Sequence, residues 1–449
     1  MITQNKGLQR HYFYGVLLFV LTVIVILFYY LNHPHPELNP DTSAYLHVVD
    51  RLRQHPYQLV DTWRLPGYPL LITLVYTLTG RNSLTAVGIA QAALFVVATL
   101  EIYILASWLL RRAWMAFFVA LLVGTNLVIL SYVKPIMSEG LALLELTTLA
   151  LAVVAFLRVR SRRRFWLIVA CMLLLLLTRP EWVYLPVPLL AYLLLATARK
   201  GEKSAFPLWR EALLALALLY GVVGIYIAVN ALTNHYTGMT AIENFNWMGK
   251  VLQYNMLDKA PPEYAVVSQK LAYYVKHIDG DPYHVLPQVP ELAQDNFSPA
   301  GRLARSIILH HPFEFLLKSV PYFFASLTCY YDIYPVAMSG PYGVLLSYIK
   351  TVYRLLYNIN ILFPFCALTW LVLFCWRYTK SRQVVLEMGA LVLLILYALI
   401  ITTLGGYRLD DYMRVHTVFH PLLILVIWSS LLMEIEVLAR KVVQLTRRK

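Results

Sequence analysis

Cysteine, charge and the common cofactor motifs are scarce or missing in this chain. Only four cysteines stand among 449 residues, and no Cys-x-x-Cys or Cys/His ligand spacing joins Cys171, Cys329, Cys366 and Cys375. This spacing argues against a structural zinc site and against a disulfide framework. The patterns GxxxxGKS/T, GxGxxG and HExxH are also absent, which removes the usual sequence signs of nucleotide binding and zinc-dependent hydrolysis.

Charged residues are too few for an ordinary soluble domain. They make up 14% of the chain against 59% hydrophobic residues, whereas soluble domains average about 25% and about 50%. The mean hydropathy is +0.61. We therefore predict an all-α polytopic membrane protein with about 10 transmembrane helices (about 10–12), because the apolar runs approach or exceed the roughly 20 residues that span a bilayer. The predicted spans are 12–31, 83–110, 113–132, 135–157, 166–178, 181–198, 211–230, 355–376, 384–404 and 416–433.

The net charge of +14 is unevenly divided between the two sides of the membrane that these spans define. Alternate loops, together with both termini, hold 21 of the 38 Lys and Arg residues and only four acids, Glu202, Glu211, Glu434 and Glu436. By the positive-inside rule this basic side is cytoplasmic, so both termini are predicted to be cytoplasmic. The charge is a topology signal, and nucleic acid is not an expected partner.

The chain divides into three parts. Residues 1–230 form an N-terminal transmembrane module whose first outer loop covers 32–82, residues 231–354 form an outer loop with juxtamembrane segments, and residues 355–449 supply the C-terminal transmembrane helices. Within the first loop, Tyr68–Thr79 is apolar but too short to cross, so we expect a helix at the interface. The loop parity requires that 231–354 cross the membrane zero or two times; we predict zero, with two re-entrant helices as the alternative.

The first outer loop carries the strongest local pattern. It contains NPDTSAY at 39–45 and RLPGYP at 64–69. Pro40, Asp41 and Thr42 resemble a helix start, where Asp41 lies near the positive end of the helix dipole and shares a face with Tyr45. A purely structural alternative is that Asp41 only caps this helix. The presence of Arg64 in the same loop favours a chemical role for Asp41.

Further ionisable residues fall at the outer ends of spans. Such groups are costly at membrane depth and are kept for function or for pairing. Arginine forks match phosphate oxygens and a carboxylate can act as a general base, so the set suits a substrate that carries a phosphate and a hydroxyl. Two structural alternatives stay open: Glu139 pairs with Lys134, and Arg179 anchors a helix end at the interface. The full set is Asp41, Arg64, Lys134, Glu139, Arg179, Glu181, Asp410, Asp411 and Arg414.

Taken in order, these motifs resemble those of the GT-C glycosyltransferases. The closest resemblance is to bacterial aminoarabinose lipid A transferases and protein O-mannosyltransferases, and it is strongest over 39–181 and weak over 231–354. The motifs that carry it are Asp41-x-x-x-Tyr45, RLPGYPL at 64–70, Ser138-Glu139, Thr178-Arg179-Pro180, and Arg414 ahead of His420-Pro421.

The resemblance implies an inverting glycosyltransferase in the bacterial inner membrane with its active site on the outer face. Such an enzyme moves a sugar from a polyprenyl-phosphate donor to a cell-envelope acceptor, which is a lipid, a glycan or a protein. Asp41 and Glu139 match the two family acids. Tyr45, Arg64, Lys134, Arg179 and Arg414 are the candidates for binding the donor phosphate and substrate, although Val415 replaces the tyrosine that often follows the last of these.

No cofactor and no metal site is expected. Asp410 and Asp411 could bind a divalent cation together with Asp41, since hard cations take oxygen ligands, but adjacent acids more often cap or solvate a loop. Two other functions are open. A lipid-linked oligosaccharide polymerase or ligase would need outer arginines but not the first-loop motif, and a transporter would place broken helices or ionisable groups at the bilayer midplane. We rank both behind the transferase.

Overall fold

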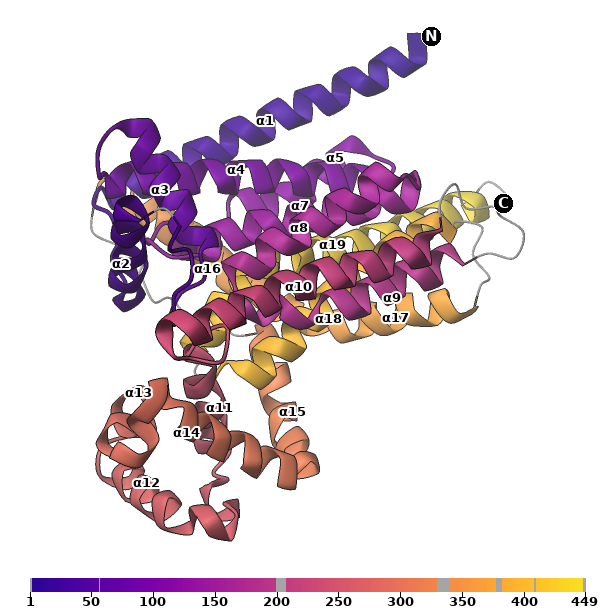
Figure 1. The fold of residues 1–449 in the computed structure, drawn as a ribbon. Coiled ribbons are helices and arrows are strands. Elements are labelled where there is room, and N and C mark those ends of the chain that lie inside the picture. The colour runs from indigo at the N-terminus through magenta and orange to yellow at the C-terminus, as the bar shows by residue number, and fades with distance from the viewer. Residues whose placement is uncertain are drawn as a thin grey trace.

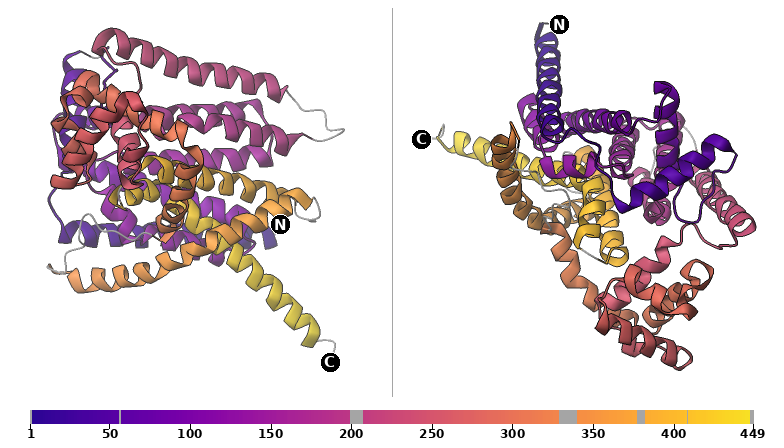
Figure 2. Two further views of the ribbon diagram at one scale, coloured as in Figure 1. Left: turned by 90° about the horizontal axis from the view of Figure 1, so that it is seen from below. Right: turned by 90° about the vertical axis from the view of Figure 1, so that its left-hand side faces the viewer.

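A computed structural model describes residues 2–55, 57–198, 207–328, 340–376, 382–407 and 409–446. Every regular element in these ranges is a helix, and they contain no strand. The long helices lie side by side in one bundle (Figures 1 and 2). This confirms the predicted all-α polytopic class. The bundle contains α1 (Ile2–Asn32), α4 (Leu84–Leu109), α5 (Ala113–Gly124), α7 (Glu139–Arg158), α8 (Arg162–Thr178), α9 (Pro186–Thr197), α10 (Leu208–Asn234), α17 (Phe363–Trp376), α18 (Arg382–Gly405) and α19 (Leu409–Thr446).

The number of membrane spans is slightly lower than predicted. Among the described residues, eight helical segments are long and apolar enough to cross a membrane, or nine if the bent pair of α5 and α6 (Leu127–Val133) counts as one. The prediction of about ten also counted 166–178. That run forms α8, which packs against α7 in the bundle but has only 17 residues and begins with three arginines. Its length and basic first turn account for the difference.

The predicted third span is broken near its end. Helix α5 stops at Gly124, and α6 starts after Asn126 at an angle of 50°. The Asn126 side chain accepts hydrogen bonds from the backbone N–H groups of Val128 (3.0 Å) and Ile129 (3.2 Å), so it caps the new helix. An Asn cap satisfies donors that would otherwise be unpaired in a buried helix start. The break directs the chain into the turn that precedes Glu139.

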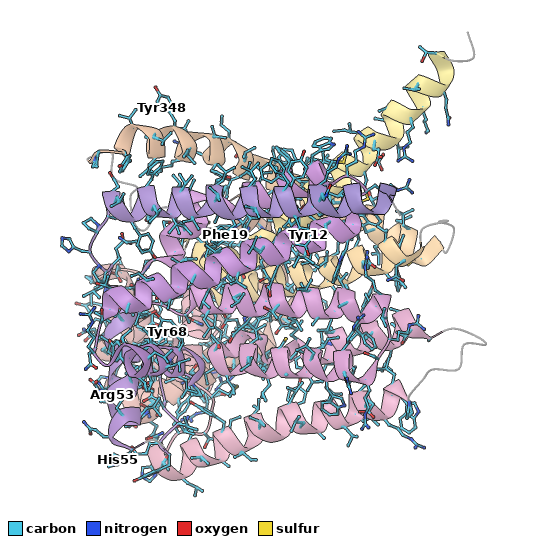
Figure 3. All side chains as sticks on the ribbon, turned by 90° about the horizontal axis from the view of Figure 1, so that it is seen from above. Tyr12, Phe19, Arg53, His55, Tyr68 and Tyr348 are labelled. Atoms are coloured by element: carbon cyan, nitrogen blue, oxygen red, sulfur yellow. The ribbon has the colours of Figure 1, made fainter. Side chains whose placement is uncertain are left out.

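The predicted span at 355–376 begins too late. An apolar helical segment covers Gly343–Cys375, formed by α16 (Gly343–Tyr357), a short 3-10 turn and α17. Lys350 and Arg354 interrupt the apolar run, which is why composition alone placed the start after them. In the structure, α16 buries Tyr353 and Tyr357, whereas its other face exposes Val344 and Tyr348 (Figure 3).

A helical lobe hangs from one end of the bundle (Figure 1). It consists of α11 (Ile242–Gln253), α12 (Ala265–His277), α13 (Pro282–Val285) and α14 (Pro290–His310), and α15 (Pro312–Thr328) leads back toward the bundle. The lobe has its own hydrophobic core, which includes Met248, Leu271 and Leu303. At the same end lie the first-loop helices α2 (Pro40–Gln54) and α3 (Gly67–Thr79), the latter covering the predicted interfacial helix. The first outer loop and the lobe therefore meet on one side.

The topology can be tested by cysteine labelling in a variant without the four natural cysteines. Arg81→Cys and Glu263→Cys lie on the side of the lobe, whereas Arg163→Cys and Gln444→Cys lie at the other end, and all four positions are exposed. Because the second end carries the arginine-rich loops, we expect a membrane-impermeant maleimide to label only the first pair in intact cells. Labelling of position 163 before permeabilisation would reverse the predicted orientation.

Candidate active site

The first outer loop presents Asp41 with its carboxylate free from capping. Asn39 is the N-cap of α2: its side chain accepts from the Asp41 N–H (2.9 Å), and its own N–H donates to Thr42 Oγ1 (2.9 Å). The alternative that Asp41 itself caps the helix is therefore wrong. The Asp41 carboxylate takes no part in the cap, and Tyr45 lies one turn later on the same face.

A tight turn places Arg64 beside Asp41. Asp61 Oδ1 accepts from the backbone N–H groups of Trp63 (2.7 Å) and Arg64 (2.9 Å), an Asx-type turn. The guanidinium of Arg64 then lies over the Tyr45 ring, 4.7 Å from its centroid. Three residues later Gly67 permits close packing on the end of α8, since a Cβ there would lie 2.9 Å from the Leu177 carbonyl oxygen.

Three arginines and two acids from distant parts of the chain meet in one ion-pair cluster. Asp41 Oδ1 accepts from Arg64 Nη2 (2.6 Å), and Asp41 Oδ2 accepts from Arg414 Nη2 (2.7 Å). Arg414 Nε also donates to Glu139 Oε1 (2.8 Å), and Arg179 Nη1 lies 3.4 Å from the same oxygen. Arg414 thus forms a bridge between Asp41 and Glu139. We call these five residues the arginine–carboxylate cluster.

The cluster is largely withdrawn from solvent. The Glu139 side chain is 0% exposed and that of Arg179 is 11% exposed, whereas the Asp41 side chain keeps 23% exposure. Burial alone would raise the pKa of Asp41, but the charges of Arg414 and Arg64 and their hydrogen bonds outweigh it and hold the pKa at about 2. Asp41 is therefore the more accessible acid, and it is ionised at neutral pH.

A cavity of about 460 Å³ opens beside the cluster. Asp41, Arg64, Arg179 and Arg414 line its charged side. Residues of the lobe and of the α18–α19 connection also line the cavity, with aromatic and polar groups, namely Asn246, Asp281, Tyr283 and Tyr407. Tyr407 is held in place there because its hydroxyl donates to Asp281 Oδ1 (3.1 Å). The volume falls in the range of small-molecule sites, about 300–1,000 Å³.

Lys134 does not join this cavity. Its ammonium donates to Glu37 Oε1 (2.9 Å) and lies 5.7 Å from the ring centroids of both Tyr29 and Tyr30, and the side chain is 3% exposed. The suggested Lys134–Glu139 ion pair is therefore wrong. Tyr45 lines the cavity. Its hydroxyl donates a hydrogen bond to Ser138 Oγ (3.2 Å), which fixes the position of the Tyr45 ring.

We expect Lys134→Met to destabilise the protein without weakening phosphate binding. The substitution leaves Glu37 unpaired, and loss of one partner of a largely buried pair costs about 3 kcal/mol. Thermal unfolding of the purified variant measures this, and the double variant Lys134→Met/Glu37→Gln should recover much of the loss. A drop in polyprenyl-phosphate affinity at unchanged stability would instead return Lys134 to the binding site.

Several residues around the site were not anticipated from the sequence. Asp61, which organises the turn before Arg64, could have been recognised from its spacing, because Asp two or three residues before a turn often accepts backbone N–H bonds. Tyr283 and Tyr407 carried no such signal. Among the described residues, no group of three His, Cys, Asp or Glu side chains is placed to hold a metal ion. The side chains of Asp410 and Asp411 lie outside the described part.

Comparison with known proteins gives only distant similarity. No family model matches the chain, and no curated protein gives a significant match. The chain is similar to the archaeal oligosaccharyltransferase AglB from Archaeoglobus fulgidus in complex with an inhibitory peptide and a dolichol-phosphate, with 11% identity and a TM-score of 0.48 over 95% of this chain and 51% of that one. It is also similar to the Archaeoglobus fulgidus oligosaccharyltransferase tethered to an acceptor peptide, with 11% identity and a TM-score of 0.42 over 92% and 49%.

The chain spans about half the length of the solved structures that it matches. Similarity of this size carries no argument about donor or acceptor.

Proposed function

We propose that this chain is an inverting glycosyltransferase that uses a polyprenyl-phosphate-linked sugar and acts on a cell-envelope lipid, glycan or protein. The observation that supports it most directly is the convergence of Arg64, Arg179 and Arg414 with Asp41 at one cavity. Three guanidiniums offer forked donors for a phosphate, and a solvent-reachable carboxylate beside them can accept a proton. The proposed setting is the outer face of a bacterial inner membrane, with both termini cytoplasmic.

The chemistry is a single displacement at the anomeric carbon. The acceptor hydroxyl oxygen forms a bond to that carbon while the bond from the carbon to the phosphate oxygen breaks. The bonding pair leaves with the polyprenyl phosphate, and the hydroxyl proton passes to Asp41. Because the leaving group is an anion, fixed cations stabilise it as the bond breaks, and no general acid is needed on that side.

The arginines must change partners for this to happen. In the structure, Asp41 and Glu139 occupy guanidinium groups that a phosphate would also use. A bound donor phosphate competes for Arg64 and Arg414 and so loosens their hold on Asp41. Donor binding would thereby make Asp41 a stronger base at the moment when the acceptor arrives. Glu139, buried and bound to Arg414 and Arg179, is better placed to orient the arginines than to meet the acceptor.

The function is tested with the purified protein, in detergent and reconstituted into vesicles. It is incubated with radiolabelled polyprenyl-phosphate sugars or polyprenyl-pyrophosphate oligosaccharides, together with envelope glycans, lipids and proteins. Transfer of label to an acceptor with inversion at the anomeric carbon is the expected result. Transfer only from polyprenyl-pyrophosphate oligosaccharides would favour the oligosaccharide ligase. Transport of label into vesicles without new bond formation would refute a transferase.

The partner exchange predicts two different pH profiles. The free enzyme holds the pKa of Asp41 at about 2, below its ordinary value, so Asp41 stays ionised throughout the range above about pH 4. The value of kcat/KM should therefore show no loss there from protonation of Asp41. In the donor complex the released Asp41 titrates at higher pH, so kcat should fall first as the pH is lowered. If kcat and kcat/KM fall at the same pH as the solution is acidified, donor binding does not release Asp41 from its arginines.

A further inference from the structure

A second hollow lies at the end of the bundle opposite the arginine–carboxylate cluster, between the start of α1 and the start of α5. Its volume is about 710 Å³, and it is lined by residues 9–11, 13–14 and 111–114. Figure 1 shows the N-terminal part of α1 far from α2 and α3, which mark the catalytic end. The proposed transferase chemistry makes no use of this hollow. We call it the arginine hollow.

The charge of the arginine hollow is of one sign. Arg10, Arg111 and Arg112 contribute guanidiniums to its lining, and none of the described residues that line it is an acid. Arg112 lies 3.7 Å from Glu436, a carboxylate that Arg440 binds at 2.6 Å. Arg10 and Arg111 have no ion pair among the described side chains. Two of the three cations are thus available to an anion from outside the chain.

The backbone supplies a further positive group at the same place. Helix α5 has 12 residues and begins at Ala113, with Arg112 as its N-cap and no side chain bonded to its first turn. The unpaired N–H groups of a helix start carry partial positive charge and bind anions. Ala113 and Trp114, in the first turn, line the hollow. The helix start and the guanidiniums therefore face the same space.

Apart from Gln9 and Ala113, the remaining lining of the hollow is aromatic. Phe13, Tyr14 and Trp114 line the hollow, and Tyr14 is fixed against Phe117 with ring centroids 5.3 Å apart. Aromatic rings gather at the level of lipid headgroups, where one side is apolar and the other is wet. Tyr12, labelled in Figure 3, extends this exposed aromatic surface along α1. A lipid would meet apolar contacts here as well as charge.

We propose that the arginine hollow binds the phosphate of a phosphate ester, supplied either by an anionic phospholipid headgroup or by a soluble phosphate compound. Arginine recognises phosphate oxygens through paired donors, which suits the guanidiniums of Arg10 and Arg111. The aromatic walls favour the lipid source, because a soluble ester would leave them in water. Basic pockets between transmembrane helices on the cytoplasmic side bind anionic headgroups in this way.

Native mass spectrometry of the detergent-purified full chain tests this proposal, with phosphatidylglycerol, phosphatidylcholine and inorganic phosphate as probes. We expect preferential retention of phosphatidylglycerol. Arg10→Gln/Arg111→Gln should weaken it by about 30-fold, since each basic residue near the headgroups contributes roughly fivefold. The control Arg163→Gln/Arg210→Gln removes two charges from the same end outside the hollow and should change retention less than about twofold.

The competition arm separates the two sources. If excess inorganic phosphate fails to displace phosphatidylglycerol, the ligand is the lipid headgroup. If phosphate binds in an Arg10- and Arg111-dependent way with no preference for the anionic lipid, the ligand is a soluble ester. Equal retention of both lipids together with no phosphate binding overturns the proposal, as does an equal effect of the two double variants. None of these results depends on whether the chain transfers sugar.

Discussion

Asp41→Asn is expected to lower turnover by about 100- to 10,000-fold, the usual contribution of a general base. The amide keeps the size of the side chain and can still accept from Arg64 or Arg414, but it takes up no proton from the acceptor hydroxyl. The Asn39 cap is independent of the Asp41 side chain, so α2 should form normally. The measurement is the initial rate of transfer by purified protein at saturating donor.

A matched control lies on the same helix. Asp50 is exposed on α2, and Asp50→Asn should leave the rate within about twofold of the wild type, as substitutions away from a site usually do. Thermal stability and polyprenyl-phosphate binding of Asp41→Asn show whether the protein is folded and still takes the donor. Near-normal turnover by a folded Asp41→Asn would remove it from the role of base and make Glu139 the next candidate.

Alanine in place of Arg64, Arg179 or Arg414 is expected to weaken donor-lipid binding by about 1.5–3 kcal/mol each, the range for hydrogen bonds to charged groups. This corresponds to roughly 10- to 150-fold in affinity. Lysine should retain part of the binding, because it keeps the charge but loses the forked geometry. The largest effect is expected at Arg414, because it alone among the three arginines bonds both Asp41 and Glu139 in the described part of the chain.

The six single variants are compared by donor-lipid titration alongside thermal unfolding. Arg81→Ala, an exposed arginine on the same side of the membrane, controls for the loss of one positive charge. An arginine that only anchors a helix end would be replaced fully by lysine. If all six variants bind the donor lipid as the wild type does, the polyprenyl-phosphate donor itself is wrong.

The sequence was sufficient for the helices because membrane crossing leaves a strong signal. Apolar runs near 20 residues, bounded by basic loops, located most spans to within a few residues. The exceptions were segments in which charged residues interrupt the apolar run. Lys350 and Arg354 hid the start of the segment at Gly343, and the three arginines at the start of α8 leave it too short for an independent span.

The pairing inside the site could not be derived in the same way. Asp41 and Arg414 are separated by 373 positions, so their contact depends on how distant helices pack. Proximity in sequence suggested an ion pair between Glu139 and Lys134. In the structure, Lys134 instead bonds Glu37. The sequence did predict that Asp41, Arg64, Glu139, Arg179 and Arg414 share one end of the bundle, where the structure brings them together, because each follows or precedes a span of recognisable length.

The bridge made by Arg414 bears on how the protein is synthesised and inserted. Its carboxylate partners belong to α2 and α7, whereas Arg414 lies on α19, the last helix of the described chain. Until that helix enters the membrane, Asp41 lacks one of its two arginines and the buried Glu139 lacks the closer of its two cations. The arginine–carboxylate cluster is thus complete only once α19 has packed against α7, so we expect a fragment that lacks α19 to be inactive.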